Sequence, residues 1–168
     1  MGLDVPLTKK QVGAACRLHQ RLDQWRLSDA ALIRLHDTLP GFDAETCLLK
    51  SIAINALYST QVFAIVRMAE HVQEVLSQTN TATAGPNLVE RIAALPTHAR
   101  ERSRQFVSFA AKLCHFFVDA ERFPIYDEAA RNVIKLHLGV GKYGNSKAHP
   151  YVAFCQNFRC LRDEAGFK

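Results

Sequence analysis

The stretch Ser108–Arg131, SFAAKLCHFFVDAERFPIYDEAAR, predicts an aromatic helix followed closely by a second helix. The apolar residues of the first helix recur at helical spacing and form one stripe: Phe109, Leu113, Phe116 and Phe117. Lys112 falls on the border of that stripe. Partial desolvation there lowers the pKa of its ammonium and makes the amine a usable nucleophile. The alternative is a structural lysine whose stem lies on the core while its head reaches water.

Asp127 is the second candidate for chemistry. Pro124 suits the first turn of a helix, and an aspartate there or at the N-cap complements the free amides and the helix dipole. That structural role explains Asp127 by itself. However, the link DAERF is short, so the two helices must pack as neighbours and Lys112 and Asp127 can face one cleft. An amine beside a carboxylate is a plausible nucleophile and proton-handling pair for Schiff-base chemistry.

The remaining chain is also helical in pattern. No alternation of apolar and polar residues persists long enough to indicate a strand, so the sequence predicts an all-α fold, a compact multi-helix domain over residues 1–168. The expected helices cover residues 9–23, 28–39, 44–58, 60–76, 87–95, 99–118, 124–138 and 151–164. Residues 77–87, SQTNTATAGPN, are polar and contain Pro and Gly. They predict a flexible linker between two helical halves.

Composition restricts the class of protein. The chain has 168 residues, 48% of them hydrophobic, which suits one domain with a substantial core. No apolar run approaches the roughly 18–20 residues of a membrane span, and the N-terminus lacks the layout of a secretory signal. We therefore expect a soluble cytoplasmic protein without a membrane partner. The five cysteines contain no CxxC and lack zinc-ligand spacing, so we expect reduced core cysteines, no metal and no cofactor.

Positive charge is concentrated in the second half of the chain. Residues 1–84 carry 8 Lys and Arg against 8 Asp and Glu, whereas residues 85–168 carry 13 against 8. The whole net charge of +5 therefore lies in the half that contains Lys112. Such a half suits a polyanion, and DNA is the expected partner. The charge is also modest enough to be incidental.

Two further segments contain candidate binding residues. The loop that begins GVGKYG at Gly139 does not fit a P-loop, but its polar residues and exposed amides could hold a nucleic-acid phosphate. The nucleic-acid-binding candidates are Arg131, Lys142, Asn145, Ser146 and Lys147. The segment INALYSTQV predicts a polar and aromatic pocket wall for a planar ligand, with Asn55, Tyr58 and Gln61 as candidates. An ordinary corner between two helices is the alternative.

INALYSTQV, followed downstream by SFAAK and FPIYD, resembles the short bacterial 8-oxoguanine DNA glycosylase-like branch of the helix-hairpin-helix DNA glycosylase superfamily. The resemblance covers roughly residues 48–131. It implies that Lys112 attacks the sugar C1′ and that Asp127 assists. It also implies a base pocket near Asn55, Tyr58 and Gln61, with further flanking or scaffold residues: Phe109, His115 and Tyr126.

The chain departs from that superfamily just before the lysine. FVSFAA stands where a glycine-bearing hairpin usually binds a DNA phosphate, so we expect a degenerate or missing hairpin. The position two residues after the aspartate is Ala129 rather than His. The resemblance implies an enzyme that excises oxidised purines and cleaves the abasic site through a lysine Schiff base. A non-catalytic nucleic-acid-binding module and a helical protein–protein interaction domain are the alternatives. The sequence does not indicate an oligomeric state.

Overall fold

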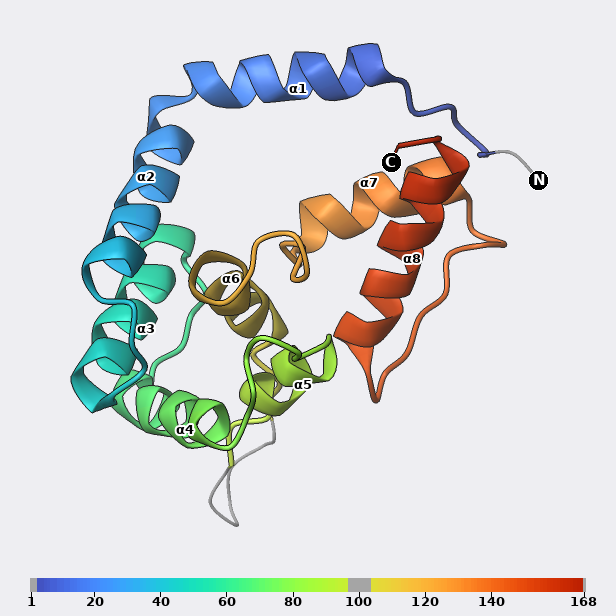
Figure 1. Ribbon diagram of the computed structural model, residues 1–168. Helices are drawn as coiled ribbons and strands as arrows, with labels where there is room; N and C mark the ends of the chain where they lie inside the picture. Colours follow the sequence, from blue (N-terminus) through green and yellow to red (C-terminus); the bar gives the residue numbers. More distant parts are fainter. Residues whose placement is uncertain (1–2, 97–103, 168) are drawn as a thin grey trace.

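A computed structural model describes residues 3–96 and 104–167 of the chain (Figure 1). Over these residues the secondary structure consists of α-helices without a strand, which confirms the all-α class. The helices are α1 (Lys9–Arg21), α2 (Asp23–Thr38), α3 (Ala44–Tyr58), α4 (Ile65–Ser77), α5 (Asn87–Ala93), α6 (Val107–Phe117), α7 (Glu128–Leu138) and α8 (Pro150–Glu164). Among the helices described, none is both long and apolar enough to cross a membrane.

Side-chain caps fix where several helices begin. Thr8 forms a capping box with Gln11 at α1, and Asp43 accepts a hydrogen bond from the Thr46 amide at α3. Asp127 caps α7 by accepting from the Ala130 amide at 2.8 Å. The helix therefore starts at Glu128, four residues later than Pro124, where we expected it to begin.

Other helix boundaries differ from the expected ones. α2 starts at Asp23, five residues before the expected Ser28, without a side-chain cap. α4 starts at Ile65 instead of residue 60, because Ser59 and Gln61 adopt left-handed backbone angles (φ 48° and 58°) that interrupt a helix. α6 starts at Val107, and residues 104–106 before it are not helical. The expected helical residues 99–103 lie outside the described residues.

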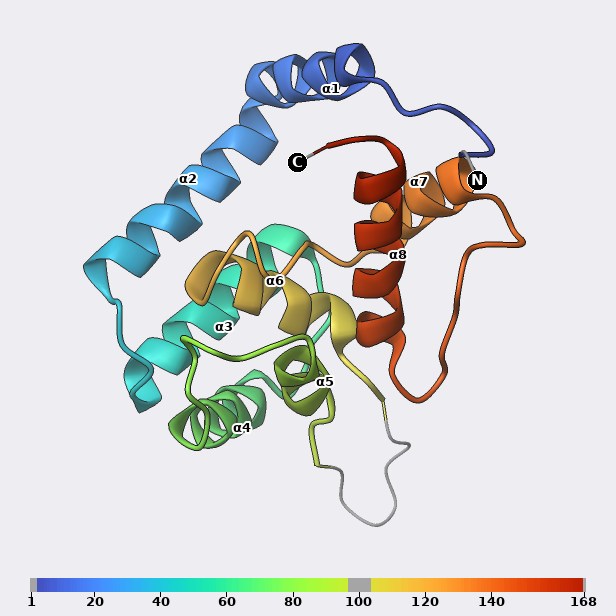
Figure 2. The same cartoon turned by 45° about the vertical axis from the view of Figure 1, so that its right-hand side comes forward.

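Helix α6 lies at the centre of the fold. It packs against α2, α3, α5 and α8, as Figure 2 shows. Its apolar side chains are buried, with Ala110, Leu113 and Phe117 almost without exposed surface. Each Å² of apolar surface buried in this way stabilises the fold by about 25 cal/mol. Helix α6 therefore forms the centre of the hydrophobic core.

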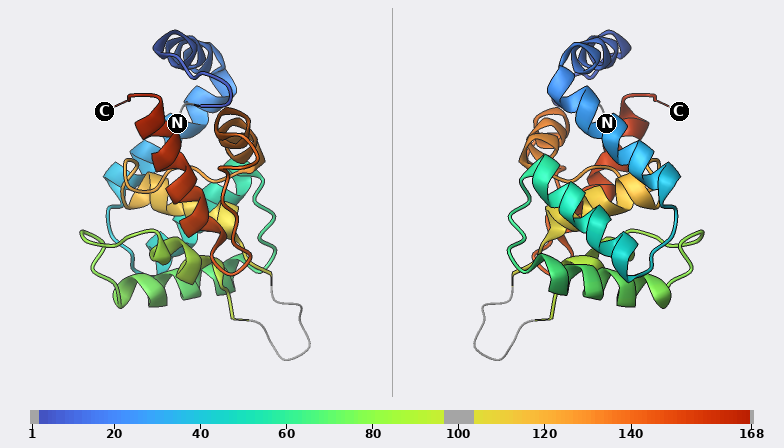
Figure 3. Two further views of the ribbon diagram at one scale, coloured as in Figure 1. Left: turned by 90° about the vertical axis from the view of Figure 1, so that its right-hand side faces the viewer. Right: turned by 90° about the vertical axis from the view of Figure 1, so that its left-hand side faces the viewer.

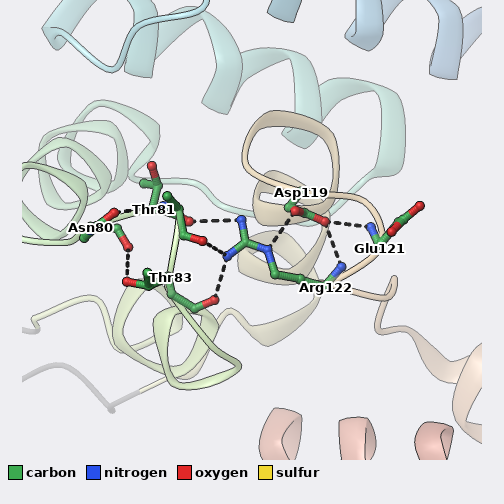
Figure 4. Close-up of polar contacts among 8 residues, drawn as sticks. Asn80, Thr81, Thr83, Asp119, Glu121 and Arg122 are labelled. Carbon is green, nitrogen blue, oxygen red and sulfur yellow. Dashed lines mark hydrogen bonds and ion pairs between the residues drawn. The ribbon is translucent and has the colours of Figure 1, made fainter.

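The segment between α4 and α5 is bonded by Arg122 (Figure 4) and by Arg91, which donates to the Thr79 hydroxyl at 2.9 Å. The Arg122 guanidinium donates to the carbonyls of Thr81, Ala82 and Ala84 at 3.0, 2.9 and 3.2 Å. Asp119 fixes the same guanidinium through its Nε at 2.7 Å. Part of the segment expected as a linker, residues 77–87, is thus hydrogen-bonded to the turn after α6.

Helix α1 is attached to the rest of the fold mainly at its two ends. It packs against α2 and has no buried residue. On the other side, the Asp4 amide donates to the His137 carbonyl at 2.9 Å, and the His137 ring nitrogen lies 2.8 Å from the Val5 carbonyl. Figures 1 and 2 show α1 extending from α2 towards the α7–α8 pair, and Figure 3 shows α1 nearly end-on. The five cysteines are free, and Cys16 on α1 is exposed instead of lying in the core.

Candidate active site

Lys112 is a buried lysine on the central helix. Its residue surface is only 3% exposed, so it lies inside the stripe and not at its border. Nζ donates to Ser108 Oγ at 2.9 Å, and it lies 3.6 Å from Asp127 Oδ2. Burial lowers the pKa of the ammonium, and the Asp127 charge opposes that shift. The interpretation of Lys112 as a lysine that reaches water is wrong, because 96% of its side-chain surface is covered.

Asp127 is the exposed end of the ion pair. Its side chain is 39% exposed, while that of Lys112 is 4% exposed. One carboxylate oxygen caps α7 and the other faces Lys112. The same side chain therefore sets the start of α7 and connects the buried amine to the surface.

Tyr58 places an aromatic ring beside the lysine. Its ring centroid lies 5.5 Å from Lys112 Nζ, within the range of a cation–π contact. The hydroxyl donates to Asp29, and Asp29 also lies 3.0 Å from His19 Nε2. Burial, followed by the Asp29 interaction, raises the pKa of the phenol far above its ordinary value. Tyr58 therefore stays a neutral donor.

Trp25 provides a partly exposed aromatic surface next to Tyr58. The two ring centroids are 6.0 Å apart, and Phe116 lies 5.7 Å from Tyr58 on the α6 side. Trp25 is 48% exposed and is the one tryptophan in the sequence. The sequence analysis missed Trp25, Asp29 and His19, because their positions on α1 and α2 carry no local sign that they meet α3.

Asn55 and Gln61 do not join Lys112 in one cluster. The Asn55 amide holds the loop after α3, bonding the Val62 backbone at 3.0 and 2.9 Å and the Thr60 hydroxyl at 2.9 Å. Gln61 accepts a long, exposed hydrogen bond of 3.5 Å from Arg104. Asn55 therefore stabilises the loop after α3, and Gln61 contacts Arg104.

The three expected flanking residues pack in different places. Phe109 is buried in the core of α6. The His115 Nδ1 lies 2.9 Å from the Phe123 carbonyl and its ring stands edge-on to Phe116. Tyr126 packs against Phe154 of α8, with ring centroids 5.1 Å apart. His115 and Tyr126 thus fix the turn that carries the chain from α6 to Asp127.

The expected nucleic-acid contacts are spread over α7 and the loop before α8. Arg131 stacks over Tyr126 at 5.3 Å, and Lys142 Nζ pairs with Glu164 at 2.9 Å. Ser146 accepts from the His149 amide at 3.0 Å. Asn145 and Lys147 are exposed and can meet a polyanion directly.

A second buried lysine, Lys50, lies on α3 and is 1% exposed. Its Nζ donates to the Gly41 carbonyl at 2.8 Å and lies 4.3 Å from the centroid of the Phe42 ring. Burial lowers the pKa of this lysine too. The two lysines differ in their nearest partners. The Gly41 carbonyl and aromatic rings contact Lys50, with Asp43 a minor influence on its pKa, whereas the Asp127 carboxylate lies 3.6 Å from Lys112 Nζ.

No metal site accompanies the lysine pair in the part of the chain that the structure describes. Within those residues, His, Cys, Asp and Glu side chains form no group of three or more that could hold a metal ion.

One protein-family model matches the chain. The family is HI_0787_N, described as an N-terminal domain, and it matches residues 11–122. These residues extend from α1 to the turn after α6 and include Lys112, Tyr58, Asp29 and Trp25. Asp127 lies five residues beyond the match. No curated protein and no solved structure matches the chain significantly.

Proposed function

This chain belongs to the HI_0787_N family, and we propose that it is a DNA glycosylase and abasic-site lyase acting on oxidised purines of the 8-oxoguanine type. The observation that carries the proposal is the buried Lys112 Nζ, 3.6 Å from the half-exposed Asp127 carboxylate. Desolvation favours the neutral amine, which is the nucleophilic form. The carboxylate lies 3.6 Å from Nζ, so it takes up and returns a proton after a closer approach or through one water.

The proposed reaction begins when Lys112 Nζ attacks C1′ of the damaged nucleotide and the glycosidic bond to the base breaks. Asp127 accepts the proton that the attacking amine releases. The carboxylic acid of Asp127 returns this proton to the departing base. The lone pair of Nζ then expels O4′, which takes up a proton as the sugar ring opens, and a protonated imine forms between Nζ and C1′. Loss of a proton from C2′ forms a C2′=C3′ double bond and expels the 3′ phosphate, which cleaves the strand. Water hydrolyses the imine, which frees the lysine and leaves an unsaturated aldehyde on the sugar.

DNA is the proposed partner because the chain is basic and the site has aromatic surfaces. The net charge is +5, all of it in residues 85–168. Extrusion of a base from the stack costs a few kcal/mol. The half-exposed Trp25, with Tyr58 behind it, offers a ring on which the extruded base can stack.

Borohydride trapping tests the proposal, with duplex DNA that contains either 8-oxoguanine or an abasic site. We expect wild-type protein to form a covalent adduct and Lys112→Met to form none. Lys50→Met is the matched control, since it removes an equally buried lysine without a facing carboxylate, and it should keep the adduct. The proposal fails if wild type gives no adduct where a known lyase does, or if Lys112→Met still gives one.

A second candidate function is a non-catalytic DNA-binding module. Two contacts favour it: Asp127 already caps α7, and Ser108 already accepts from Lys112. Both residues would then be structural. This candidate predicts salt-dependent DNA retention with equal affinity for damaged and intact duplex, and no adduct with borohydride.

A further inference from the structure

An apolar cavity of about 660 Å³ lies between α1 on one side and α7 and α8 on the other. Its walls also include the turn between α6 and α7. The side chains that define the opposing walls are Val12, Ala15 and Cys16 from α1, and Val133, Ile134 and Phe158 from α7 and α8. Neither Lys112 nor Asp127 lines this cavity, so it is separate from the candidate active site.

The α1 wall is held at both ends of the helix. At one end α1 continues into α2, and at the other the backbone of Asp4 and Val5 is bonded to His137 at the end of α7. None of the α1 side chains is buried, although those of Val12 and Ala15 face the cavity. The apolar face of α1 is thus held opposite the apolar face of α7 and α8, with the cavity between them.

The chemistry of the walls selects a neutral occupant. The lining contains no Lys, Arg, Asp or Glu. Its polar side chains are Gln11, Cys16 and His115, and Gln11 Oε1 already accepts from the Thr8 hydroxyl at 2.7 Å. One His115 ring nitrogen is occupied by the Phe123 carbonyl. A bound water needs two to four polar partners, and a charged ligand needs a counter-charge, so the walls suit neither.

The volume of the cavity, about 660 Å³, lies within the range of about 300–1,000 Å³ that small-molecule sites commonly occupy.

From these walls and this volume we infer that the α1–α7–α8 cavity is a binding site for a neutral, largely apolar small molecule. A single polar group on that molecule would face His115 or Cys16. The inference does not rest on the proposed glycosylase activity. It gives α1, which contributes little to the core, a role as a wall of a binding site.

Two related fluorescent probes test the charge requirement. N-phenyl-1-naphthylamine is neutral, and 8-anilinonaphthalene-1-sulfonate carries a sulfonate on a similar ring system. Titration into the full chain should show saturable binding of the neutral probe at one site, at least tenfold tighter than binding of the sulfonate. Equal affinities, or no saturable binding of the neutral probe, would overturn the inference.

Two adjacent alanines on α1 locate the site. Ala15→Phe fills the cavity and should weaken binding of the neutral probe at least fivefold. Ala14→Phe is the control, because Ala14 lies on another face of α1 beside Arg17 and Arg21, and it should change affinity less than twofold. Circular dichroism checks that both variants fold. Equal effects of the two variants would place the probe elsewhere. Sedimentation of the wild type as a dimer that excludes the probe would show that a second copy covers the face.

Discussion

The energetic coupling between Lys112 and Asp127 can be measured by a double-mutant cycle. Their charged atoms are 3.6 Å apart. Coulomb's law gives about 1 kcal/mol at that distance with the dielectric constant of water and about 5 kcal/mol with an effective value of 20. Solvent around the 39% exposed Asp127 side chain moves the expectation to the lower part of this range, about 1–2 kcal/mol.

Asp127→Asn is the right perturbation because asparagine caps a helix about as well as aspartate. The substitution therefore removes the charge and keeps the start of α7. We expect it to lower the free energy of unfolding by about 1–2 kcal/mol in the wild-type background, where it leaves a buried ammonium with Ser108 alone. In the Lys112→Met background the same change should cost less than about 0.5 kcal/mol.

Urea denaturation of the four proteins supplies the cycle, with the dependence of unfolding free energy on urea as a check on two-state behaviour. Asp127→Ala should lose about 1 kcal/mol more than Asp127→Asn in both backgrounds, because it also removes the N-cap. An equal cost of Asp127→Asn with and without Lys112 would refute a charge–charge coupling between the two side chains.

Three further outcomes are expected. Burial lowers the pKa of Lys50 in the folded protein, so the unfolded chain binds the proton of the Lys50 ammonium more tightly than the folded protein does. The free energy of unfolding of the wild type, relative to that of Lys50→Met, should therefore rise as the pH increases towards the ordinary lysine pKa of 10.5. Urea titrations from neutral to alkaline pH measure this, and a flat difference would contradict it. Trp25 emission should be quenched more by duplex DNA with an abasic site than by intact duplex, and equal quenching would remove Trp25 from the site. Arg122→Ala should cost about 2–4 kcal/mol and open residues 78–86 to proteolysis, because three loop carbonyls lose their donor; limited proteolysis with an unchanged cleavage pattern would show that the loop is held otherwise.

Side-chain caps marked the starts of two helices correctly but not that of α7, which Asp127 caps at Glu128 although we expected it to begin at Pro124. Thr8 and Asp43 mark α1 and α3 at the residues where the structure begins them. The beginnings of α2 and α4 were predicted wrongly, since no side chain caps either helix and backbone angles decide their limits. Likewise, no local pattern shows that Arg122 reaches back about forty residues to hold the loop after α4.

The candidate site was predictable only where it is local in sequence. Lys112 and Asp127 come from consecutive helices, and they do meet. Asp29 and Trp25 reach the site through the packing of α2 on α3 and α6, which no spacing within α2 reveals. Lys50 was overlooked although it carries a readable sign, an isolated lysine in the apolar run LLKSIAI.

The contact between residues 4–5 and His137 has a consequence for folding during synthesis, because it can form only after α7 has been made. The His137 ring and the Val5 carbonyl are 132 positions apart, so Val5 is synthesised well before its partner. Closing a loop of that length costs roughly 4 kcal/mol of chain entropy. On the ribosome, α3 to α6 can assemble around their own contacts while α1 remains unattached at its leading end. Among the helices described, α1 can therefore take its place over the α7–α8 face only after α7 has been synthesised.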